Sequence, residues 1–310
     1  MSRRTRVAGV LGAVLLLLGG GAVLLDVVRG AGTGGDDRRD AGPRGGGREV
    51  PAGFRPERGG PRAGVVTVAS FNVLGADHTG PGGDSKPDWP EYTERLPEMV
   101  DMLDEASVGV AGLQELQKRQ WALLRSDHGD TWGVFPRTDT VVTANTIVWR
   151  RADWTLVRAR QFDIPYFGGV PQAQAWATLR QRSTGRTLHL VNVHNPYDLN
   201  GSNERYRARA LRIERRLVQR LATDGSPVFL VGDFNEITDP HCVLTRAGMT
   251  NAFGDGGSSP CRPPRRAGID QVFTLGVDAG PARVDTAGIR RQVSDHPLVT
   301  VRLPGGRVPD

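Results

Sequence analysis

The 310-residue chain has little cysteine, little histidine and almost no lysine. Its two cysteines exclude a disulfide-dense scaffold and a four-cysteine zinc site. Six histidines in the whole chain also argue against a multi-histidine zinc centre. Net basic charge is scarce outside the N-terminus: residues 1–64 hold 11 Arg and 6 acids (+5), and residues 65–310 hold 29 basic and 28 acidic groups (+1), which together give the formal +6. The body of the chain therefore carries no electrostatic signature of broad polyanion binding.

A long apolar run occurs only near the N-terminus. Basic residues at positions 3, 4 and 6 precede nineteen uncharged residues, 7–25, which as a helix would span about 28 Å, close to the thickness of a hydrocarbon core. We predict that residues 1–29 are a transmembrane anchor, or alternatively a cleaved signal segment. Because positive charge precedes the apolar run, we expect the rest of the protein to be extracytoplasmic, either membrane-anchored or secreted.

The composition changes twice after this segment. Residues 30–64 consist mainly of Gly, Pro, Arg and Asp, which predicts a flexible linker. Residues 65–303 have the alternating texture of a globular α/β domain, and residues 304–310 form a short tail. The sequence shows no internal repeat.

Within 65–303, short apolar and β-branched runs predict strands, and two stretches have helical spacing. The predicted strands are 65–71, 108–114, 145–150, 174–180, 187–194, 226–235, 270–275 and 297–303, and the helices are 91–106 and 203–222. In the second helix, one apolar stripe contains Tyr206, Ala210, Ile213, Leu217 and Leu221. Several strands follow one another without a helix between them, which favours mixed sheets covered by helices over a parallel barrel.

Polar residues gather where these strands begin or end. They are Asn72, Glu115, His194, Asn195, Asp233, Asn235, Asp270, Asp295 and His296. Each one alone is a common turn former or cap, but the packing of apolar strands does not require a polar residue at every end. Together they predict a site where strand ends converge. Amide and carboxylate oxygens suit a hard cation, Mg²⁺ or Mn²⁺, and a nearby histidine suits proton transfer.

Six motifs occur in a fixed order along residues 65–303: SFNVLG, GLQE, VNVHNP, VGDFN, GIDQVF and SDHPLV. In this order and spacing the chain resembles the endonuclease/exonuclease/phosphatase superfamily. The resemblance implies a deoxyribonuclease I-like, four-layer α/β sandwich, in which two mixed β-sheets pack face to face with helices outside. It also implies metal-dependent hydrolysis of a phosphoester bond.

The resemblance assigns metal binding to one group of residues. Glu115 matches the principal metal-binding glutamate and Asn72 the asparagine that accompanies it. Asp295 matches the aspartate near the metal. The implied cofactor is Mg²⁺ or Mn²⁺.

A second group of residues is implied to be catalytic. His194 matches the histidine that contacts the phosphate, and Asp233 and Asn235 match the pair that orients the attacking water. His296 matches the general base, and Asp270 matches the carboxylate that fixes its tautomer.

The substrate stays open at the level of the sequence. We expect an extracytoplasmic nuclease or phosphodiesterase, with a phosphatase or phospholipase acting on inositol phosphates or sphingomyelin-type lipids as the alternative. A catalytically dead surface binding module is a further alternative. The expected partners are a phosphoester substrate (a nucleic acid, phospholipid or sugar phosphate) and the membrane through residues 1–29, with the chain a monomer.

Three other features have competing interpretations. Cys242 and Cys261 would pair in an oxidising compartment and otherwise remain thiols. His78, in a glycine-rich loop after Asn72, is expected to be a solvated loop histidine, although it is close enough along the chain to reach the site. His189, inside a strand, is expected to be structural.

Overall fold

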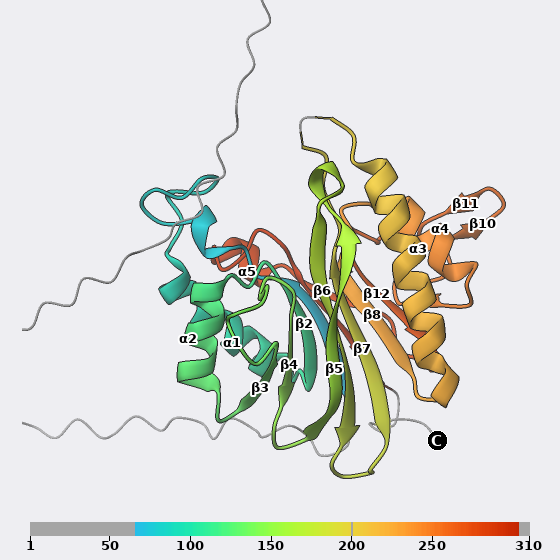
Figure 1. The fold of residues 1–310 in the computed structure, drawn as a ribbon, viewed down its shortest axis with the longest axis horizontal. Coiled ribbons are helices and arrows are strands. Elements are labelled where there is room, and N and C mark those ends of the chain that lie inside the picture. Colours follow the sequence, from blue (N-terminus) through green and yellow to red (C-terminus); the bar gives the residue numbers. More distant parts are fainter. Residues whose placement is uncertain (1–65, 200, 304–310) are drawn as a thin grey trace, which may run out of the picture. The chain divides into compact units, whose positions relative to one another are not determined.

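The computed structural model describes residues 66–199 and 201–303, which form two stacked β-sheets with helices on their outer faces (Figure 1). The predicted anchor 1–29, linker 30–64 and tail 304–310 lie outside the described residues. Among the helices of the described residues, none is both long and apolar enough to cross a membrane.

The first sheet has six strands in the order β13-β14-β1-β2-β4-β3. Their bounds are β13 Arg283–Asp285, β14 Leu298–Arg302, β1 Thr67–Asn72, β2 Val110–Gln114, β4 Thr146–Arg150 and β3 Trp132–Phe135. Only β1 and β2 run parallel, connected through helix α1 (Tyr92–Glu105); the other pairs are antiparallel. Helices α2 (Lys118–His128) and α5 (Ala287–Arg290) lie on the same side as α1 (Figure 1).

The second sheet also has six strands, in the order β5-β6-β7-β8-β12-β9. Their bounds are β5 Trp154–Pro165, β6 Pro171–Gln181, β7 Thr187–His194, β8 Val228–Asp233, β12 Asp270–Leu275 and β9 Thr250–Asn251. Again one pair is parallel, β7 and β8, connected through helix α3 (Glu204–Leu221). Helix α4 (Thr238–Thr245) lies on the α3 side (Figure 1). The short elements are the β10 (Gly257–Ser258)–β11 (Cys261–Arg262) hairpin and the 3₁₀ turns η1 (Ala76–His78), η2 (Phe167–Gly169) and η3 (Ala222–Asp224).

The alternation of side chains along each central strand builds the four layers. Val68 of β1 and Val231 of β8 belong to the same core between the two sheets. Phe71 of β1 faces the other way, into a core with α1, and Leu230 of β8 packs into a third core with α3. The predicted four-layer sandwich of two mixed sheets is thereby confirmed.

The sequence prediction missed several elements and shifted one helix face. Edge strand β5 has mostly exposed or half-buried side chains, so it shows no continuous apolar run. Helix α2 and strand β3 were not predicted either. In α3 the expected stripe is partly wrong, because Ile213 is only half-buried while Arg207 and Glu214 are buried.

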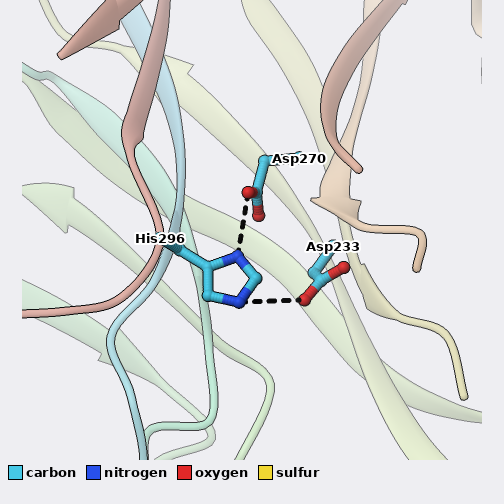
Figure 2. A group of neighbouring side chains, drawn as sticks. All are labelled: Asp233, Asp270 and His296. Carbon is cyan, nitrogen blue, oxygen red and sulfur yellow. Dashed lines mark hydrogen bonds and ion pairs between the residues drawn. The ribbon is translucent and has the colours of Figure 1, made fainter. Parts of the chain in front are cut away.

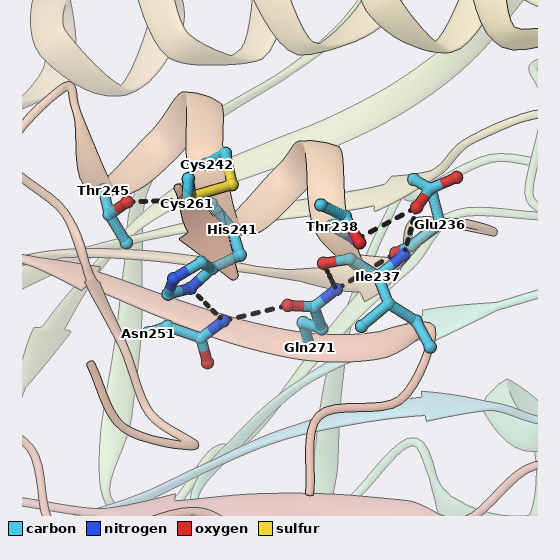
Figure 3. The surroundings of a disulfide bond; sticks show 9 residues. All are labelled: Glu236, Ile237, Thr238, His241, Cys242, Thr245, Asn251, Cys261 and Gln271. Atoms are coloured by element: carbon cyan, nitrogen blue, oxygen red, sulfur yellow. Dashed lines mark hydrogen bonds between the residues drawn. A yellow bond between two sulfur atoms is a disulfide. The ribbon is translucent and has the colours of Figure 1, made fainter. Parts of the chain in front are cut away.

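Cys242 of α4 and Cys261 of β11 form a disulfide, so the pairing that the sequence left open is present in the structure (Figure 3). The bond joins the end of the hairpin to the helix that follows β8. Beside it, His241 is buried next to Asn251, whose amide also hydrogen bonds to Gln271 of β12 at 2.9 Å. In the chain-entropy picture, closing this loop contributes about 3 kcal/mol to stability.

Candidate active site

The two parallel strand pairs end at the same edge of the sandwich, and their last residues meet there. Asn72 ends β1 next to Gln114 of β2, and His194 ends β7 next to Asp233 of β8. The Asn72 amide donates hydrogen bonds to Glu115 Oε1 at 2.8 Å and to Asp233 Oδ2 at 3.2 Å. Asn72 therefore connects the first sheet to the second at the centre of the site.

Glu115 enters the site because the chain turns immediately after β2. Its backbone has a left-handed φ of 60°, which is unusual for a glutamate and aims the side chain back over the strand end. Oε2 accepts a hydrogen bond from the Gly75 amide at 3.0 Å. Burial alone would raise the pKa of Glu115, but the His194 charge, the Asn72 and Gly75 hydrogen bonds and His78 outweigh it and hold the pKa below its ordinary value. The side chain is thus kept ready as an anion.

His296 and Asp270 form the dyad that the sequence anticipated (Figure 2). His296 Nδ1 lies 2.9 Å from Asp270 Oδ2, and His296 Nε2 faces Asp233 Oδ2 at 3.7 Å. Burial lowers the pKa of His296, but Asp270, Asp233 and Asp295 together raise it to about 9. The imidazole is therefore bracketed by carboxylates on both ring nitrogens.

Ser294 positions this histidine through the backbone and was not predicted as a site residue. Its hydroxyl donates to the Asn72 carbonyl at 2.6 Å and accepts from the His296 amide at 3.1 Å. It therefore ties the segment before β14 to the end of β1. Ser294 is the first residue of the SDHPLV motif. Its hydrogen-bond partners are backbone groups, which no residue pattern reveals.

The second sheet places His194 and Asn235 around Asp233. His194 Nε2 lies 3.6 Å from Asp233 Oδ2. Asp233 Oδ1 accepts a hydrogen bond from the backbone N–H of Asn235 at 2.9 Å. Asn235 has a left-handed φ of 50°, and its side-chain nitrogen donates to the Asn195 carbonyl at 2.9 Å. This turn presents the Asn235 side chain at the end of β8.

An aromatic cluster adjoins His194. The Tyr166 ring meets His194 edge-on at a centroid distance of 6.0 Å, Phe167 lies 4.4 Å from Tyr166, and Tyr197 lies 4.9 Å from Phe167. Burial, with Glu115 and Asp233 nearby, raises the pKa of Tyr166. Tyr197 at the outer end is 44% exposed, so the cluster leads from the site to the surface.

Asp295 directly precedes His296 in the segment before β14. Its Oδ2 is 3.4 Å from Lys86 Nζ, and its Oδ1 is buried without a hydrogen-bond partner among the described residues.

Beneath the loops at this end, Arg95 of α1 is buried. It donates hydrogen bonds to the carbonyl oxygens of Val73, Leu74, Gly75, Pro90 and Val293. Burial lowers the pKa of Arg95 to about 10, against the opposing effect of Asp295 and Glu115. This guanidinium, which the sequence analysis missed, braces the segments that carry Asn72 and Asp295.

Two groups of side chains are candidates for binding a divalent cation. Glu115 and Asp295 offer carboxylate oxygens, and Asp295 Oδ1 lacks a hydrogen-bond partner among the described residues. The Asn72 amide turns its nitrogen toward Glu115 and Asp233, while its Oδ1 accepts from the Leu74 backbone amide. Ligand atoms of Asp233, Asp270 and His296 also lie within 4.8 Å of one another. Because His296 is already hydrogen-bonded to Asp270, the metal ligands that the resemblance implies, Glu115, Asn72 and Asp295, stay a prediction beside this group.

The surroundings of three other side chains are also defined. His78 is half-exposed, and its Nε2 lies 3.5 Å from Glu115 Oε2, so this loop histidine does reach the site. Arg207 of α3 is buried and paired with Asp198 at 2.8 Å. His189 is structural as expected: it is buried and hydrogen-bonded to Thr178 and Asp224.

No protein-family model matches the chain, and no curated protein matches it in sequence. Solved structures do match. An endonuclease/exonuclease/phosphatase family protein from Bacteroides thetaiotaomicron superposes with a TM-score of 0.60 at 18% identity, covering 77% of this chain and 97% of that one. The mannosyl-6-phosphatase Bt3783 from the same species gives 0.59 at 18% identity, covering 76% and 98%.

TDP2 from D. rerio, solved with a single-strand DNA product, gives a TM-score of 0.57 at 17% identity, covering 77% of this chain and 98% of that one. The architecture defines a two-sheet α/β sandwich with its polar site at the strand ends. The chain has the fold of the endonuclease/exonuclease/phosphatase superfamily, as its motifs had indicated.

Proposed function

We propose that the protein is a divalent-metal-dependent phosphoester hydrolase. The observation that carries the proposal is the His296–Asp270 dyad, which faces Asp233 beside the Asn72–Glu115 pair. An oriented imidazole next to a carboxylate cluster that fits a cation is the arrangement that metal-assisted attack of water on phosphorus requires.

The side chains take complementary roles in this proposal. Asp270 accepts the Nδ1 hydrogen of His296, so in the neutral form of the ring, which the raised pKa of about 9 favours only at alkaline pH, Nε2 is left to remove a proton from water. Asp233 and Asn235 hold that water and the phosphoryl oxygens at the end of β8. His194, on the other side of Asp233, binds the phosphate and can protonate the leaving group. Glu115, Asn72 and Asp295 would hold a divalent cation, which would polarise a phosphoryl oxygen.

A turnover assay of the full-length chain with bis-p-nitrophenyl phosphate tests the reaction. We expect activity with added Mg²⁺ or Mn²⁺, loss of activity with a chelator and recovery when metal is returned. His296→Ala should lower kcat by about 10²–10⁴-fold with an unchanged circular dichroism spectrum. Tight ligand binding without metal-dependent turnover would instead favour the catalytically inactive binding module.

For the substrate, we propose a nucleic acid or another phosphodiester. The aromatic cluster next to His194 supports this, because bases stack on such rings. The likeness to TDP2, which was solved with a DNA product, is consistent with it.

The alternative is a phosphatase acting on a sugar phosphate or lipid headgroup, and the likeness to a mannosyl-6-phosphatase favours it. A panel of phosphodiesters (plasmid DNA, single-stranded DNA, RNA and sphingomyelin) and phosphomonoesters (mannose 6-phosphate and inositol phosphates) separates the two. Release of inorganic phosphate only from the monoesters would reject the phosphodiesterase.

We also propose that the catalytic domain acts outside the cytoplasm as a monomer. The predicted anchor or signal segment supports an extracytoplasmic location, and the Cys242–Cys261 disulfide is compatible with an oxidising compartment. Protease accessibility of the domain in intact cells tests the location. Digestion only after cell lysis would reject it.

A further inference from the structure

The loop between β1 and α1 folds back over the site and brings a histidine to the metal side. His78 Nε2 lies 3.5 Å from Glu115 Oε2, and His78 Nδ1 lies 2.5 Å from Asp84 Oδ1. A carboxylate only accepts hydrogen bonds, so Nδ1 carries the hydrogen that Asp84 accepts. Nε2 is therefore the ring atom that faces Glu115, where a cation bound between the two would be shared with Oε2.

The separation of Nε2 and Oε2 suits two ligands of one cation better than a direct hydrogen bond. At 3.5 Å the pair is at the outer limit for hydrogen bonding. Two ligand atoms bound to one ion at about 2.1 Å lie about 3.0 Å apart at an octahedral angle of about 90° and about 3.4 Å apart at a tetrahedral angle of about 110°, so a small approach of the two side chains would suffice. Histidines that bind metals also commonly donate their other ring N–H to a carboxylate, and Asp84 provides this partner.

The loop is held in this position by backbone contacts. The Lys86 amide donates to the His78 carbonyl at 2.8 Å, which closes the loop on itself. The Asp77 amide donates to Gln117 Oε1 at 2.8 Å, and Gln117 is two residues beyond Glu115. His78 and Glu115 are thus fixed relative to one another through adjacent segments.

Two glycines make this packing feasible. A Cβ on Gly83 would lie 2.7 Å from the His78 carbonyl oxygen, and a Cβ on Gly75 would lie 3.0 Å from His78 Cδ2. A Cβ at either position would force its neighbours to shift, so both glycines allow the loop to pack this closely.

We propose that His78 is a nitrogen ligand of the divalent cation held by Glu115, which makes the centre select a first-row transition ion over Mg²⁺. This inference rests on the proposed metal-dependent function. Mg²⁺ is bound through oxygen ligands and retained water, whereas imidazole favours transition metals. The residue that sets the metal preference of the site therefore lies in a loop outside the motifs shared with the superfamily.

Metal binding to the full-length chain without substrate tests the proposal. Pulsed electron paramagnetic resonance of bound Mn²⁺ should show coupling to an imidazole nitrogen, and His78→Ala should lose it. By calorimetry, His78→Ala should weaken Mn²⁺ binding about tenfold or more and change Mg²⁺ binding less than about twofold. His128→Ala, a histidine at the end of α2 outside the site, is the matched control and should behave like the wild type.

The outcomes separate this proposal from the function on which it rests. Mn²⁺ binding with the same nitrogen coupling in His78→Ala would overturn the role of His78 and leave the metal-dependent hydrolase intact. No Mn²⁺ or Mg²⁺ binding to the wild type would overturn both. If His78→Ala does not fold, Asp84→Asn keeps the imidazole and should weaken Mn²⁺ binding to a smaller extent; an unchanged Mn²⁺ affinity would also overturn the proposal.

Discussion

The two parallel strand pairs of the sandwich have the same backbone plan and different chemistry. In each sheet a strand, a helix and a parallel strand follow one another, as β1-α1-β2 and as β7-α3-β8. Beyond each second strand one residue adopts a left-handed φ, Glu115 at 60° and Asn235 at 50°. The first pair carries Asn72 and Glu115, and the second carries His194 and Asp233.

This comparison shows how one architecture can supply two halves of a site. Strand ends at one edge give fixed positions, and the residue types at those positions decide the chemistry. The first pair offers an amide and a carboxylate, the donors of a hard cation, and the second offers an imidazole and a carboxylate for phosphate and water. The sequence shows no repeat because the two pairs share only backbone geometry and apolar strand composition.

The largest effect on metal binding and turnover should come from neutralising one carboxylate in each half separately. Glu115→Gln should weaken Mn²⁺ binding by more than about 100-fold, because even the outer partners of metal ligands contribute 10–100-fold. Its activity should recover partly at high metal concentration. Asp233→Asn should instead lower kcat by about 10²–10³-fold and leave Mn²⁺ affinity nearly unchanged. Kinetics as a function of metal concentration measures both.

The comparison between the halves fails if these two variants behave alike. An Asp233→Asn protein whose activity returns with added metal would place the cation on the second sheet. A Glu115→Gln protein with normal Mn²⁺ affinity would remove it from the first. Circular dichroism spectra of both variants should match the wild type, since each substitution keeps the shape of the side chain.

The halves also differ in what lies beneath them. Under the first, Arg95 is a buried charge whose donors are taken up by backbone carbonyls. Under the second, Glu214 of α3 is fully buried, and neither carboxyl oxygen has a hydrogen bond of normal geometry within the described part of the chain. Burial raises the pKa of Glu214 to about 8, with a smaller opposing effect from its neighbour Asn195.

The burial of Glu214 should make the stability of the protein fall as pH rises. The folded-state pKa of about 8 exceeds the ordinary value of 4.5, so the stability contribution is complete below about pH 4.5 and is lost as pH approaches 8. Glu214→Gln removes this dependence. Relative to the wild type, the variant should gain on the order of 4 kcal/mol in free energy of unfolding between pH 5 and pH 8. Urea denaturation at both pH values measures it.

The exposed Glu204, in the first turn of the same helix, provides the control. Glu204→Gln should keep the wild-type dependence of stability on pH. If Glu214→Gln keeps it too, the carboxyl is ionised in the folded protein.

The sequence could predict those parts of the structure that show in a local pattern of residues. Buried central strands such as β2 and β12 appear as apolar runs with a polar terminus, so both the strands and their end residues were predicted. Edge strand β5 has no such run because one of its sides has no neighbouring strand and much of it is exposed. The fold and the eight candidate site residues therefore followed from pattern and resemblance.

The rest depends on contacts between segments far apart in the chain. Arg95 and Ser294 act through backbone carbonyls and amides, which leave no residue signature. His78 reaches Glu115 only because a loop closes through backbone hydrogen bonds. The apolar stripe predicted that Ile213 faces the core. In the structure α3 is oriented so that Glu214 is buried and Ile213 is only half-buried.

The smallest expected effect concerns the aromatic cluster, which adjoins only the second half of the site. Tyr197→Ala should raise KM for a single-stranded oligonucleotide about fivefold with little change in kcat, since stacking of one base contributes about 1–3 kcal/mol and Tyr197 is only part of the cluster. Val170→Ala, which truncates another exposed apolar side chain, should leave KM unchanged. Steady-state kinetics on oligonucleotides of increasing length measures it. An equal KM for Tyr197→Ala and wild type at every length would mean that Tyr197 does not contact the substrate.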